Sequence, residues 1–345
     1  MLTSDFDYDL PEERIAQEPA PRGESRLLVL DAEGPDRHRR VRDLPALLRP
    51  GDLVVLNDTR VIPARLFGRR GEGKMEVLLV EKLEKLGDRE WEALLRPGKR
   101  AKPGTRIDFD ELSAEVIEKR EDRYRLRFSE PVEPHLDRLG HIPLPPYIHR
   151  PDEAADRERY QTVFARTPGA IAAPTAGLHF SKALLEQLRT AWVTLHVGIG
   201  TFKPVSAERI EDHRMDRERY EVSEQTAEAI RRTKESGGRI VAVGTTVVRT
   251  LESSGGEPGS GSTELFITPG YRFRVVDVLL TNFHLPRSTL LMLVSAFAGR
   301  ERVLAAYEEA IREGYRFYSY GDAMLVERQA EGLMSGEHAR WHGMG

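Results

Sequence analysis

The sequence contains no cysteine among its 345 residues. This absence excludes disulfides, thiolate nucleophiles, iron–sulfur clusters held by cysteine and cysteine-ligated zinc, which leaves histidine and carboxylates as possible metal ligands. His213 and Asp216 lie one helical turn apart, but no third ligand follows at a recognisable spacing. We therefore expect no bound metal and a chemistry that depends on acid–base and electrostatic groups.

Long apolar runs are also missing. The longest uncharged stretches, 167–181 and 288–299, are shorter than the roughly 20 apolar residues that a membrane helix needs. Residues 1–17 carry several acids and no apolar centre, so they do not resemble a secretory signal. These features predict a soluble, cytoplasmic protein that does not associate with membranes.

A strong charge of one sign is absent as well. The chain has 52 basic and 56 acidic residues, a formal net charge of −4. A histone-like polycation is thereby excluded. A nucleic-acid partner is not, because phosphate recognition requires only a local basic face.

The organisation of the chain changes twice along its length. Between about residues 65 and 140, short alternating strands follow one another at close spacing, which is typical of a small antiparallel sheet or barrel. A proline-rich stretch, 141–147, has the composition of an extended return linker. After residue 160, strands and helices alternate, as in an α/β domain. At about one domain per 150 residues, the length allows roughly two domains, and the pattern predicts that one interrupts the other.

Within the α/β part, apolar runs and capping residues predict individual elements. Ser223 is placed to cap a helix that ends before two glycines, and the glycine- and serine-rich segment 253–262 is expected to be a mobile loop. The expected strands are 27–30, 53–56, 193–197 and 239–243, and the expected helices are 181–189, 224–236 and 301–313.

Four polar residues, Asn57-Asp58-Thr59-Arg60, come directly after the expected strand 53–56. Their hydrogen-bonding capacities differ, and the end of a buried strand is where α/β proteins tend to place chemistry. An ordinary turn would account for the same composition, so the motif alone leaves both interpretations open.

Two further segments carry small residues near a histidine. Segment 173–180 precedes a helix, so its backbone N–H groups could face an anion, although a tight loop with a packed histidine is the alternative. In segment 195–204, Gly198 and Gly200 follow His196, but the third glycine of a dinucleotide fingerprint is missing and Pro204 blocks the expected helix start. The two glycines still allow close approach to the backbone, and a nucleoside fits better than a pyrophosphate.

Three later segments place polar side chains beside strands. Segment 243–249 ends in Arg249, whose guanidinium could hold a carboxylate by a bidentate contact. In segment 279–289, Asn282 and His284 alternate along an extended stretch, so both are expected on one face. Segment 317–325 surrounds Asp322 with aromatic residues, which suits a cation, although aromatic core packing is the commoner explanation.

Taken together, six segments resemble one family in the same order along the chain. They are 57–65, 173–180, 196–202, 244–249, 281–291 and 315–325. The sequence is similar to the S-adenosylmethionine:tRNA ribosyltransferase-isomerases of queuosine biosynthesis. The resemblance implies transfer and isomerisation of the ribosyl moiety of S-adenosylmethionine, the co-substrate, onto 7-aminomethyl-7-deazaguanine at the wobble position of tRNA. The implied products are epoxyqueuosine-tRNA, adenine and methionine.

The family fold implied by this resemblance is an α/β domain interrupted by a small β-barrel. We therefore predict an α/β fold class in which a larger α/β, barrel-like catalytic domain comprises residues 1–64 and 147–326. A small antiparallel β-barrel domain is inserted at 65–146, and a polar C-terminal extension occupies 327–345. A monomer is favoured.

The implied reaction requires a base for the acceptor amine, and a group that removes a proton from the 5′ carbon beside the sulfonium. Asp58, His196 and His284 are the candidate catalytic residues, with acid and base unassigned between them. Arg249 is the candidate for the methionine carboxylate, and Phe202 or Tyr320 for the sulfonium. The candidates for binding S-adenosylmethionine are Thr175, Gly177, His179, Gly198, Gly200, Thr201, Phe202, Thr245, Arg249, Asn282, Tyr320 and Asp322.

The tRNA implied as partner needs a basic surface. The most basic local set is Arg60, Arg65, Lys99, Arg100 and Lys102. If these side chains meet phosphates, they contribute to a salt-dependent affinity, and surface solubility is the alternative explanation of their charge.

Three features depart from the family pattern. The family usually has a second histidine where this chain has Asp216, the connection 188–193 is shorter than usual, and residues 327–345 lie outside the shared motifs. Two other function classes remain as alternatives. A non-catalytic RNA-binding protein would not need acids and histidines at strand ends, and a His/Asp metallohydrolase would need a further ligand.

Overall fold

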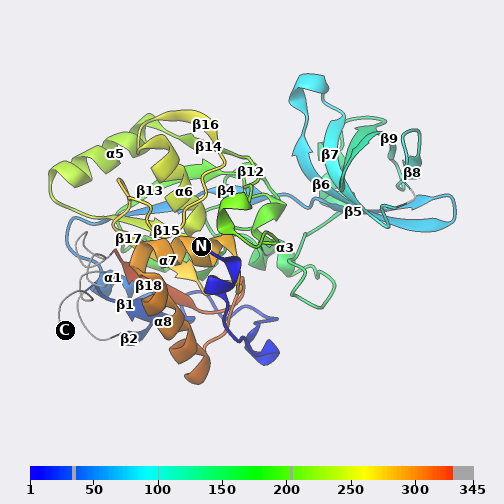
Figure 1. Cartoon of the computed structure of the whole chain (residues 1–345). Coiled ribbons are helices and arrows are strands. Elements are labelled where there is room, and N and C mark those ends of the chain that lie inside the picture. The colour runs from blue at the N-terminus through cyan, green and yellow to red at the C-terminus, as the bar shows by residue number, and fades with distance from the viewer. Residues whose placement is uncertain (33–35, 100, 203–204, 329–345) are drawn as a thin grey trace, which may run out of the picture.

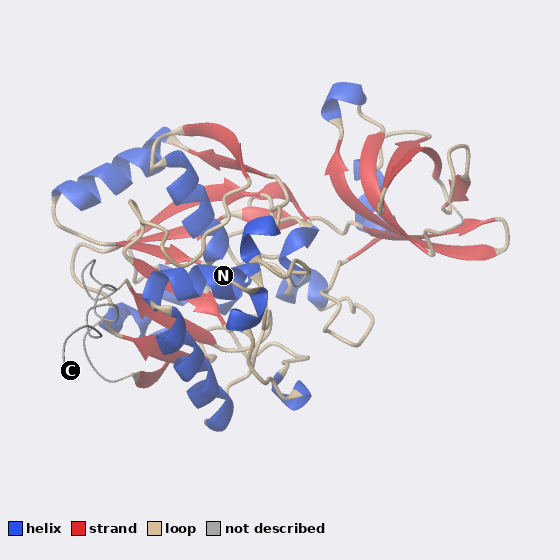
Figure 2. Ribbon diagram, in the orientation of Figure 1, coloured by secondary structure: helices blue, strands red, loops and turns tan. Residues whose placement is uncertain are grey.

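The computed structural model describes residues 1–32, 36–99, 101–202 and 205–328. Figure 1 shows a large body built around one sheet, with a smaller barrel that projects from its side. The chain enters the barrel after β4 (Thr59–Val61) and returns from it through the proline-rich segment that follows β11 (Gly140–His141). Extended connections therefore join the barrel to the body, as Figure 2 shows.

The body is organised by a nine-stranded mixed sheet. In spatial order its strands are β16 (Gly259–Thr263), β14 (Glu218–Val222), β13 (Thr190–Leu195), β3 (Leu53–Asn57), β15 (Ile240–Val243), β17 (Val278–Asn282), β18 (Ala323–Glu327), β1 (Arg26–Leu30) and β2 (Arg37–Arg40). The neighbouring strands β13, β3, β15 and β17 are parallel. Their carboxyl ends therefore meet at one edge of the sheet, the position at which α/β folds bind ligands.

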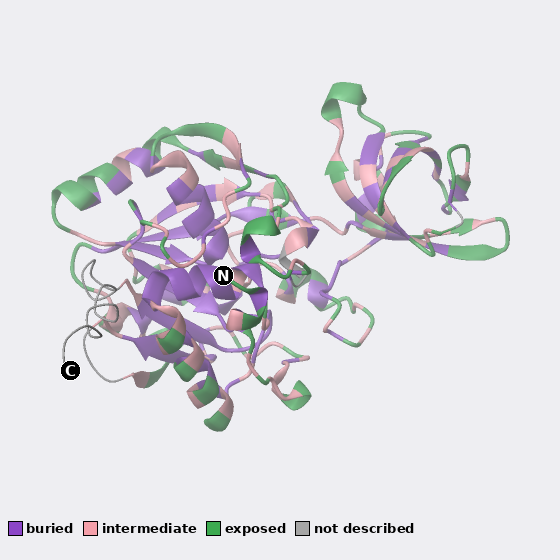
Figure 3. Cartoon of the chain, viewed as in Figure 1, coloured by how far each residue is buried: buried purple, intermediate pink, exposed green. Residues whose placement is uncertain are grey.

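Helices cover both faces of this sheet. One layer contains α5 (Glu224–Glu235), α6 (Thr245–Ser254), α7 (Thr289–Ala298) and α8 (Arg300–Arg312), and the other contains the short helices α1 (Leu44–Leu47) and α4 (Lys182–Leu185). Alternate residues of β3 enter the two layers: Leu53 packs with the first and Val54 with the second. Burial on both faces explains why this strand is a continuous apolar run (Figure 3).

The smaller part is a closed antiparallel barrel. Its strands are β5 (Arg65–Arg70), β6 (Gly73–Lys82), β7 (Glu90–Arg96), β10 (Arg123–Phe128), β9 (Ser113–Arg120) and β8 (Arg106–Asp108), and a β5–β8 pairing closes the ring. Their inward side chains form a separate core. The predicted fold class, an α/β domain interrupted by an antiparallel β-barrel, is confirmed. The short helices α2 (Leu136–Leu139) and α3 (Asp156–Arg159) flank the return to the body.

Several predicted elements differ in detail. The segment 253–262 is a loop only at 255–258: α6 continues to Ser254, and β16, which begins at Gly259, pairs with β14 at the edge of the sheet. Backbone pairing needs no apolar side chain, so composition did not indicate this strand. The helix expected at 181–189 stops at Leu185, because β13 already begins at Thr190. The predicted Ser223 cap is confirmed, with Ser223 Oγ accepting from the Thr226 N–H at 3.2 Å.

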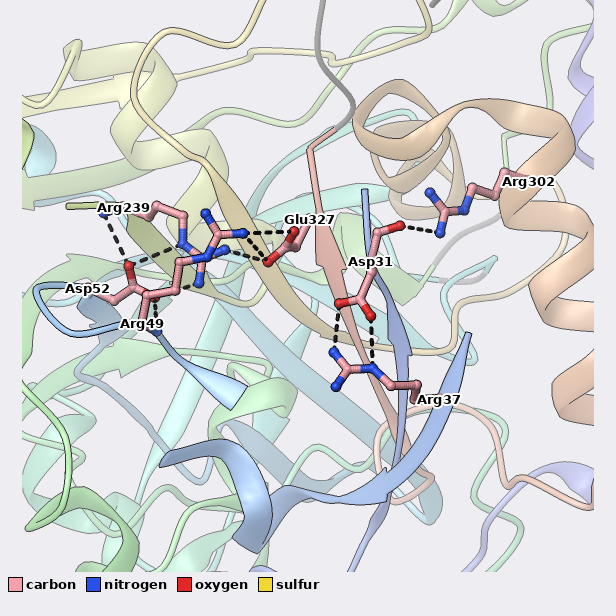
Figure 4. Close-up of polar contacts among 7 residues, drawn as sticks. All are labelled: Asp31, Arg37, Arg49, Asp52, Arg239, Arg302 and Glu327. Carbon is pink, nitrogen blue, oxygen red and sulfur yellow. Dashed lines mark hydrogen bonds and ion pairs between the residues drawn. The ribbon is translucent and has the colours of Figure 1, made fainter. Parts of the chain in front are cut away.

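An ion-pair network lies at the amino ends of the parallel strands, opposite to the edge where their carboxyl ends meet (Figure 4). Arg239, just before β15, donates through Nη2 to Asp52 Oδ2 at 2.6 Å and also pairs with Glu327 at the end of β18. Arg49 joins the same Glu327 carboxylate at 3.3 Å. Glu327, which the sequence assigns to the extension, is thus the last residue of β18, and residues 329–345 lie outside the described part.

Among the described residues, no helix combines the length and apolar character needed to span a bilayer.

Candidate active site

A cavity lies where β15 and β17 end, and we call it the strand-end cavity. Its walls come from the first turn of α6, the segment after β17, the stretch before the short helix 175–179, and two aromatic segments. The lining side chains and backbone belong to Tyr147, 172–176, Val197, 244–246, 281–285, Ser288, Leu290, Tyr318 and Ser319. Five of the six sequence motifs therefore meet at this cavity, all except 57–65, although they are far apart along the chain.

Asn282 and His284 both line the strand-end cavity, as their alternation predicts. His284 Nε2 is 2.8 Å from Thr281 Oγ1, and burial lowers the pKa of His284 to about 3. The imidazole is therefore neutral near pH 7. Asn282 Nδ2 donates to the Tyr318 carbonyl oxygen at 2.9 Å.

The residues of segment 173–180 have different places relative to the strand-end cavity. Thr175 lines the cavity. Gly177 is required by packing, since a Cβ there would lie 2.9 Å from both Phe164 and Thr162. His179 is buried with Nδ1 3.0 Å from Ser25 Oγ, and burial lowers its pKa to about 4. Gly177 and His179 thus support the cavity wall.

A larger cleft of about 660 Å³ separates the barrel from the body, and we call it the interdomain cleft. Val197 belongs to the walls of both this cleft and the strand-end cavity. His196 lines the cleft, with Nδ1 2.9 Å from Thr59 Oγ1. Burial, helped by the positive charge of Arg219, lowers the pKa of His196, so its neutral form is favoured. The strand-end cavity holds only about 70 Å³, so Val197 joins a small chamber to a much larger one.

Asp58 directly precedes Thr59, the hydrogen-bond partner of His196, and both of its carboxylate oxygens accept hydrogen bonds. Oδ2 accepts from Arg166 Nε at 3.1 Å and from Nη2 at 2.8 Å, and Oδ1 accepts from Thr194 Oγ1 at 2.6 Å. The negative charge of Asp58 opposes the lowering of the His196 pKa. The residue can therefore stabilise a positive charge on His196.

Arg249 is placed in a buried ion pair with Glu218, and both side chains are 5% exposed or less. Glu218 Oε1 also accepts the Gly198 N–H at 3.1 Å. The pair thus fastens α6 to the loop after β13. Gly200 packs on Asp216, whose Oδ2 would lie 2.8 Å from a Cβ at that position. Thr201 and Phe202 belong to the short helix Ile199–Phe202, but their side chains lie outside the described part.

Tyr320 and Asp322 brace the last polar loop. Tyr320 donates its hydroxyl to Asp156 Oδ1 at 3.1 Å. Asp322 accepts from the backbone N–H groups of Arg26 and Arg316, each at 2.8 Å. In the same segment, Tyr318 and Ser319 line the strand-end cavity.

Comparison with known proteins agrees with this arrangement of motifs. The family model described as queuosine biosynthesis protein matches residues 3–326. The chain belongs to this family. An S-adenosylmethionine:tRNA ribosyltransferase-isomerase of Pelobacter propionicus is 56% identical over 95% of this chain and 100% of its own length. One of Gloeobacter violaceus is 56% identical over 94% of this chain and 96% of its own. A crystal structure of S-adenosylmethionine tRNA ribosyltransferase from Thermotoga maritima is 42% identical, covers 94% of this chain and 100% of that one, and has a TM-score of 0.53.

This member of the queuosine biosynthesis family has an aromatic pair that sequence reasoning missed. The rings of Tyr147 and Tyr318 are 4.6 Å apart, and both line the strand-end cavity. Tyr318 has a φ of +72°, a conformation that non-glycine residues rarely adopt. Tyr147 lies in the stretch interpreted as a linker, so only the fold brings it to the site.

The predicted RNA-binding residues lie in different places. Arg60 lines the interdomain cleft. Arg65 donates to the Leu144 carbonyl oxygen at 3.1 Å and pairs with Glu76 at 3.3 Å. Lys99 and Lys102 are exposed on the barrel, and Arg100 lies outside the described residues. The cleft also contains cations that the sequence did not single out: Lys82, Arg123, Arg157, Arg217 and Arg219.

Asp216, where the resemblance implies histidine, pairs with Arg123 of the barrel at 3.1 Å. Within the described ranges, no group of three or more potential ligands could hold a metal ion. The expectation that no metal is needed stays a prediction.

Proposed function

We propose that this chain transfers and isomerises the ribosyl moiety of S-adenosylmethionine onto 7-aminomethyl-7-deazaguanine at the wobble position of tRNA, in queuosine biosynthesis. The products would be epoxyqueuosine-tRNA, adenine and methionine. The observation that carries the proposal is the pair of chambers with the shared wall at Val197. A transfer between a nucleoside and an RNA base requires such adjacent sites, and the relatives named above carry this activity in their names.

The strand-end cavity, at about 70 Å³, would receive one part of S-adenosylmethionine, and the rest of the molecule would extend past Val197 into the interdomain cleft. Thr175, Thr245 and Asn282 offer polar contacts in the cavity, and Tyr147 and Tyr318 offer ring faces to the adenine or the sulfonium. Because Tyr320 is held by Asp156, we now favour Tyr318 for the sulfonium. Arg249 keeps its proposed role toward the methionine carboxylate, which requires that it exchange its contact with Glu218.

The interdomain cleft would receive the wobble base, which must leave its stack to enter any pocket. The neutral form of His196 is favoured, so we propose that it is the base that removes a proton from the ammonium group of the acceptor. Asp58 would then stabilise the imidazolium by its charge. His284, neutral and beside the strand-end cavity, is assigned the proton on the 5′ carbon. Each transfer needs a base within hydrogen-bond reach of its proton.

The test is incubation of the purified protein with S-adenosylmethionine and tRNA that carries the aminomethyl base. We expect stoichiometric release of adenine and methionine and formation of epoxyqueuosine, with equal rates in the presence and absence of chelator. Failure to release adenine in a folded preparation would contradict the proposal, and binding without turnover would favour an RNA-binding protein. Loss of activity with chelator would favour a metal enzyme.

The setting follows from the same proposal. A tRNA-modifying enzyme acts where tRNA is found, and we place this one in the cytoplasm. We also propose that it acts as a monomer, since both chambers are formed within one chain.

A further inference from the structure

A second groove adjoins the interdomain cleft, and we call it the arginine groove. It has a volume of about 380 Å³, and its walls come from the segment 154–165, which contains α3, together with Arg22 and Arg60. Arg60, Arg157 and Gln161 line both the groove and the cleft. Figure 1 shows α3 on the side of the body from which the barrel projects. A strand of which one base enters the cleft can therefore continue into the groove.

The arginine side chains of this groove contact neutral groups. Arg22 donates to three backbone carbonyl oxygens, among them that of Gln161 at 2.7 Å. Arg157 donates to the Gly140 carbonyl oxygen at 2.6 Å. Among the described residues, no carboxylate lies within ion-pair distance of Arg22, Arg60 or Arg157. Because a carbonyl dipole does not neutralise a full charge, these guanidinium groups keep their charge available for an anion.

The charge balance distinguishes the arginine groove from the interdomain cleft. Six basic and six acidic side chains line the cleft in the described part of the chain. Three basic side chains and a single acidic one, Glu158, line the groove within the same described ranges. A polyanion therefore gains more from the groove than from the cleft, since the positive charge of the groove is only partly compensated.

A fourth arginine adds to this concentration of positive charge. Burial and the positive charge of Arg159 lower the pKa of Arg22, and the charge of Glu158 opposes this effect only in part. Arg159 also contacts a neutral group, since its Nη2 donates to the Ala20 carbonyl oxygen at 2.5 Å. Cations that are held together without counter-charge favour a bound anion, because the anion offsets their mutual repulsion.

Strand β4 links the groove to the proposed base. Thr59 and Val61 are buried and Arg60 between them is exposed, as the alternation of side chains along a strand requires. Thr59 Oγ1 is 2.9 Å from His196 Nδ1. Gln161 holds the strand in place, because its Oε1 accepts the Val61 N–H at 2.9 Å and its Nε2 donates to the Val61 carbonyl oxygen at 3.1 Å. The guanidinium of Arg60 thus belongs to the residue next to the partner of His196.

We propose that the arginine groove binds the sugar–phosphate backbone of the tRNA beside the wobble nucleotide. Contacts to phosphate and sugar fix the register of a nucleic acid on a protein, and the planar guanidinium matches two phosphate oxygens. The wobble base enters the interdomain cleft, and the neighbouring phosphates stay in the groove, where they hold the strand while the base is out of its stack. This inference rests on the proposed function, because it states where the substrate of that reaction is held.

The first test is the salt dependence of tRNA binding by the full chain, measured by filter binding. Arg157→Gln should weaken binding about ten-fold, the size of one charge-assisted hydrogen bond. It should also reduce the slope of log affinity against log salt by roughly 0.7 to 0.9, the value for one phosphate contact. The control Arg231→Gln removes the same charge from the exposed face of α5 and should leave the slope unchanged. An unchanged slope in Arg157→Gln would overturn the proposal.

A gain of affinity excludes misfolding as the cause of these effects. Glu158→Gln removes the acidic side chain of the groove, and the backbone carbonyl of residue 158 can still accept from Arg22. The variant should bind tRNA about two-fold to five-fold more tightly at low salt, with unchanged affinity for S-adenosylmethionine. Weaker or unchanged binding of tRNA would contradict a phosphate site in this groove.

A neutral phosphate analogue locates the contact on the RNA. The probe is a synthetic anticodon stem–loop with the aminomethyl base and one methylphosphonate, placed in turn at each phosphate beside the wobble nucleotide. At the contacted phosphate, the analogue should weaken binding to the wild type and add no further loss in Arg157→Gln. Additive losses at every position would overturn the proposal. If the wild type binds the stem–loop in this pattern but releases no adenine, the proposed function fails and the groove remains an RNA site.

Discussion

At the scale of single residues, the proposed site contains two imidazoles, His196 and His284, whose neutral forms are favoured by burial, which lowers the pKa of each. The lowered pKa of His196 means that its basic form is already dominant at neutral pH. His196→Gln should therefore reduce the single-turnover rate by about two orders of magnitude, the usual contribution of a general base. In the wild type, the rate should rise with pH through a value below the ordinary histidine pKa of about 6.5 and then level off. A limb centred above that value, or a near-normal rate in the variant, would contradict the assignment.

Arg249 presents a residue-scale conflict between structure and ligand binding. Arg249→Ala leaves Glu218 buried without its counter-charge, which should lower the free energy of unfolding by about 3 kcal/mol. Arg249→Met combined with Glu218→Gln removes both charges and should recover most of that stability. If Arg249 also binds the methionine carboxylate, the affinity of the double variant for S-adenosylmethionine, measured by calorimetry, should stay low. Full recovery of affinity would leave Arg249 a purely structural residue.

At the scale of elements, the ion-pair network of Arg49, Asp52, Arg239 and Glu327 links strand ends that are distant in sequence. Burial raises the pKa of Asp52, but hydrogen bonds from Arg239 and Arg49 outweigh it and leave the pKa below its usual value. Asp52 thus stabilises the fold above its unfolded pKa of about 3.9, and this contribution disappears as the pH falls through the lower folded value. Asp52→Asn should cost about 3 kcal/mol at pH 7 and flatten the acid limb of the stability curve. The matched control, Glu228→Gln on the exposed face of α5, should leave the thermal midpoint unchanged.

The sequence predicted elements wherever a local signal was sufficient. Apolar runs located β1 and β3, and a hydroxyl located the start of α5. Partners distant in sequence were not predictable. The contacts of Arg249 with Glu218 and of Tyr147 with Tyr318 depend on which strands become neighbours. The sequence showed Asp322 among aromatic residues, which left a cation site and aromatic core packing both open. Whether the carboxylate faces a ligand or two backbone N–H groups depends on the fold.

At the scale of the whole molecule, the net charge of −4 requires that cations be concentrated where RNA binds. The interdomain cleft is lined by six basic side chains, including Arg60, and by six acidic ones, so its charge is balanced and individual cations have to be tested. Arg60→Ala should reduce the slope of log affinity for tRNA against log salt by roughly 0.7 to 0.9, the value for one released phosphate contact. The pair Lys99→Ala and Lys102→Ala tests whether the exposed end of the barrel also contacts RNA. Filter binding over a range of salt concentrations measures both, and an unchanged slope would count against a phosphate contact at the substituted residues.

The barrel insertion also bears on how the sheet assembles. Strands β3 and β13 are neighbours, although the whole barrel lies between them in sequence. Inside the insertion, β11 pairs with β5, and His141 lies opposite Arg65. The first and last strands of the insertion are thereby hydrogen-bonded to each other where the chain leaves and re-enters the body. Once the barrel has folded, it acts as a short connection, and the loop between β3 and β13 is reduced mainly to residues 142–189. Because loop-closure entropy grows with the logarithm of loop length, this lowers the cost of pairing β3 with β13 by about 1 kcal/mol. Folding of the barrel thus shortens the search that the large sheet must make.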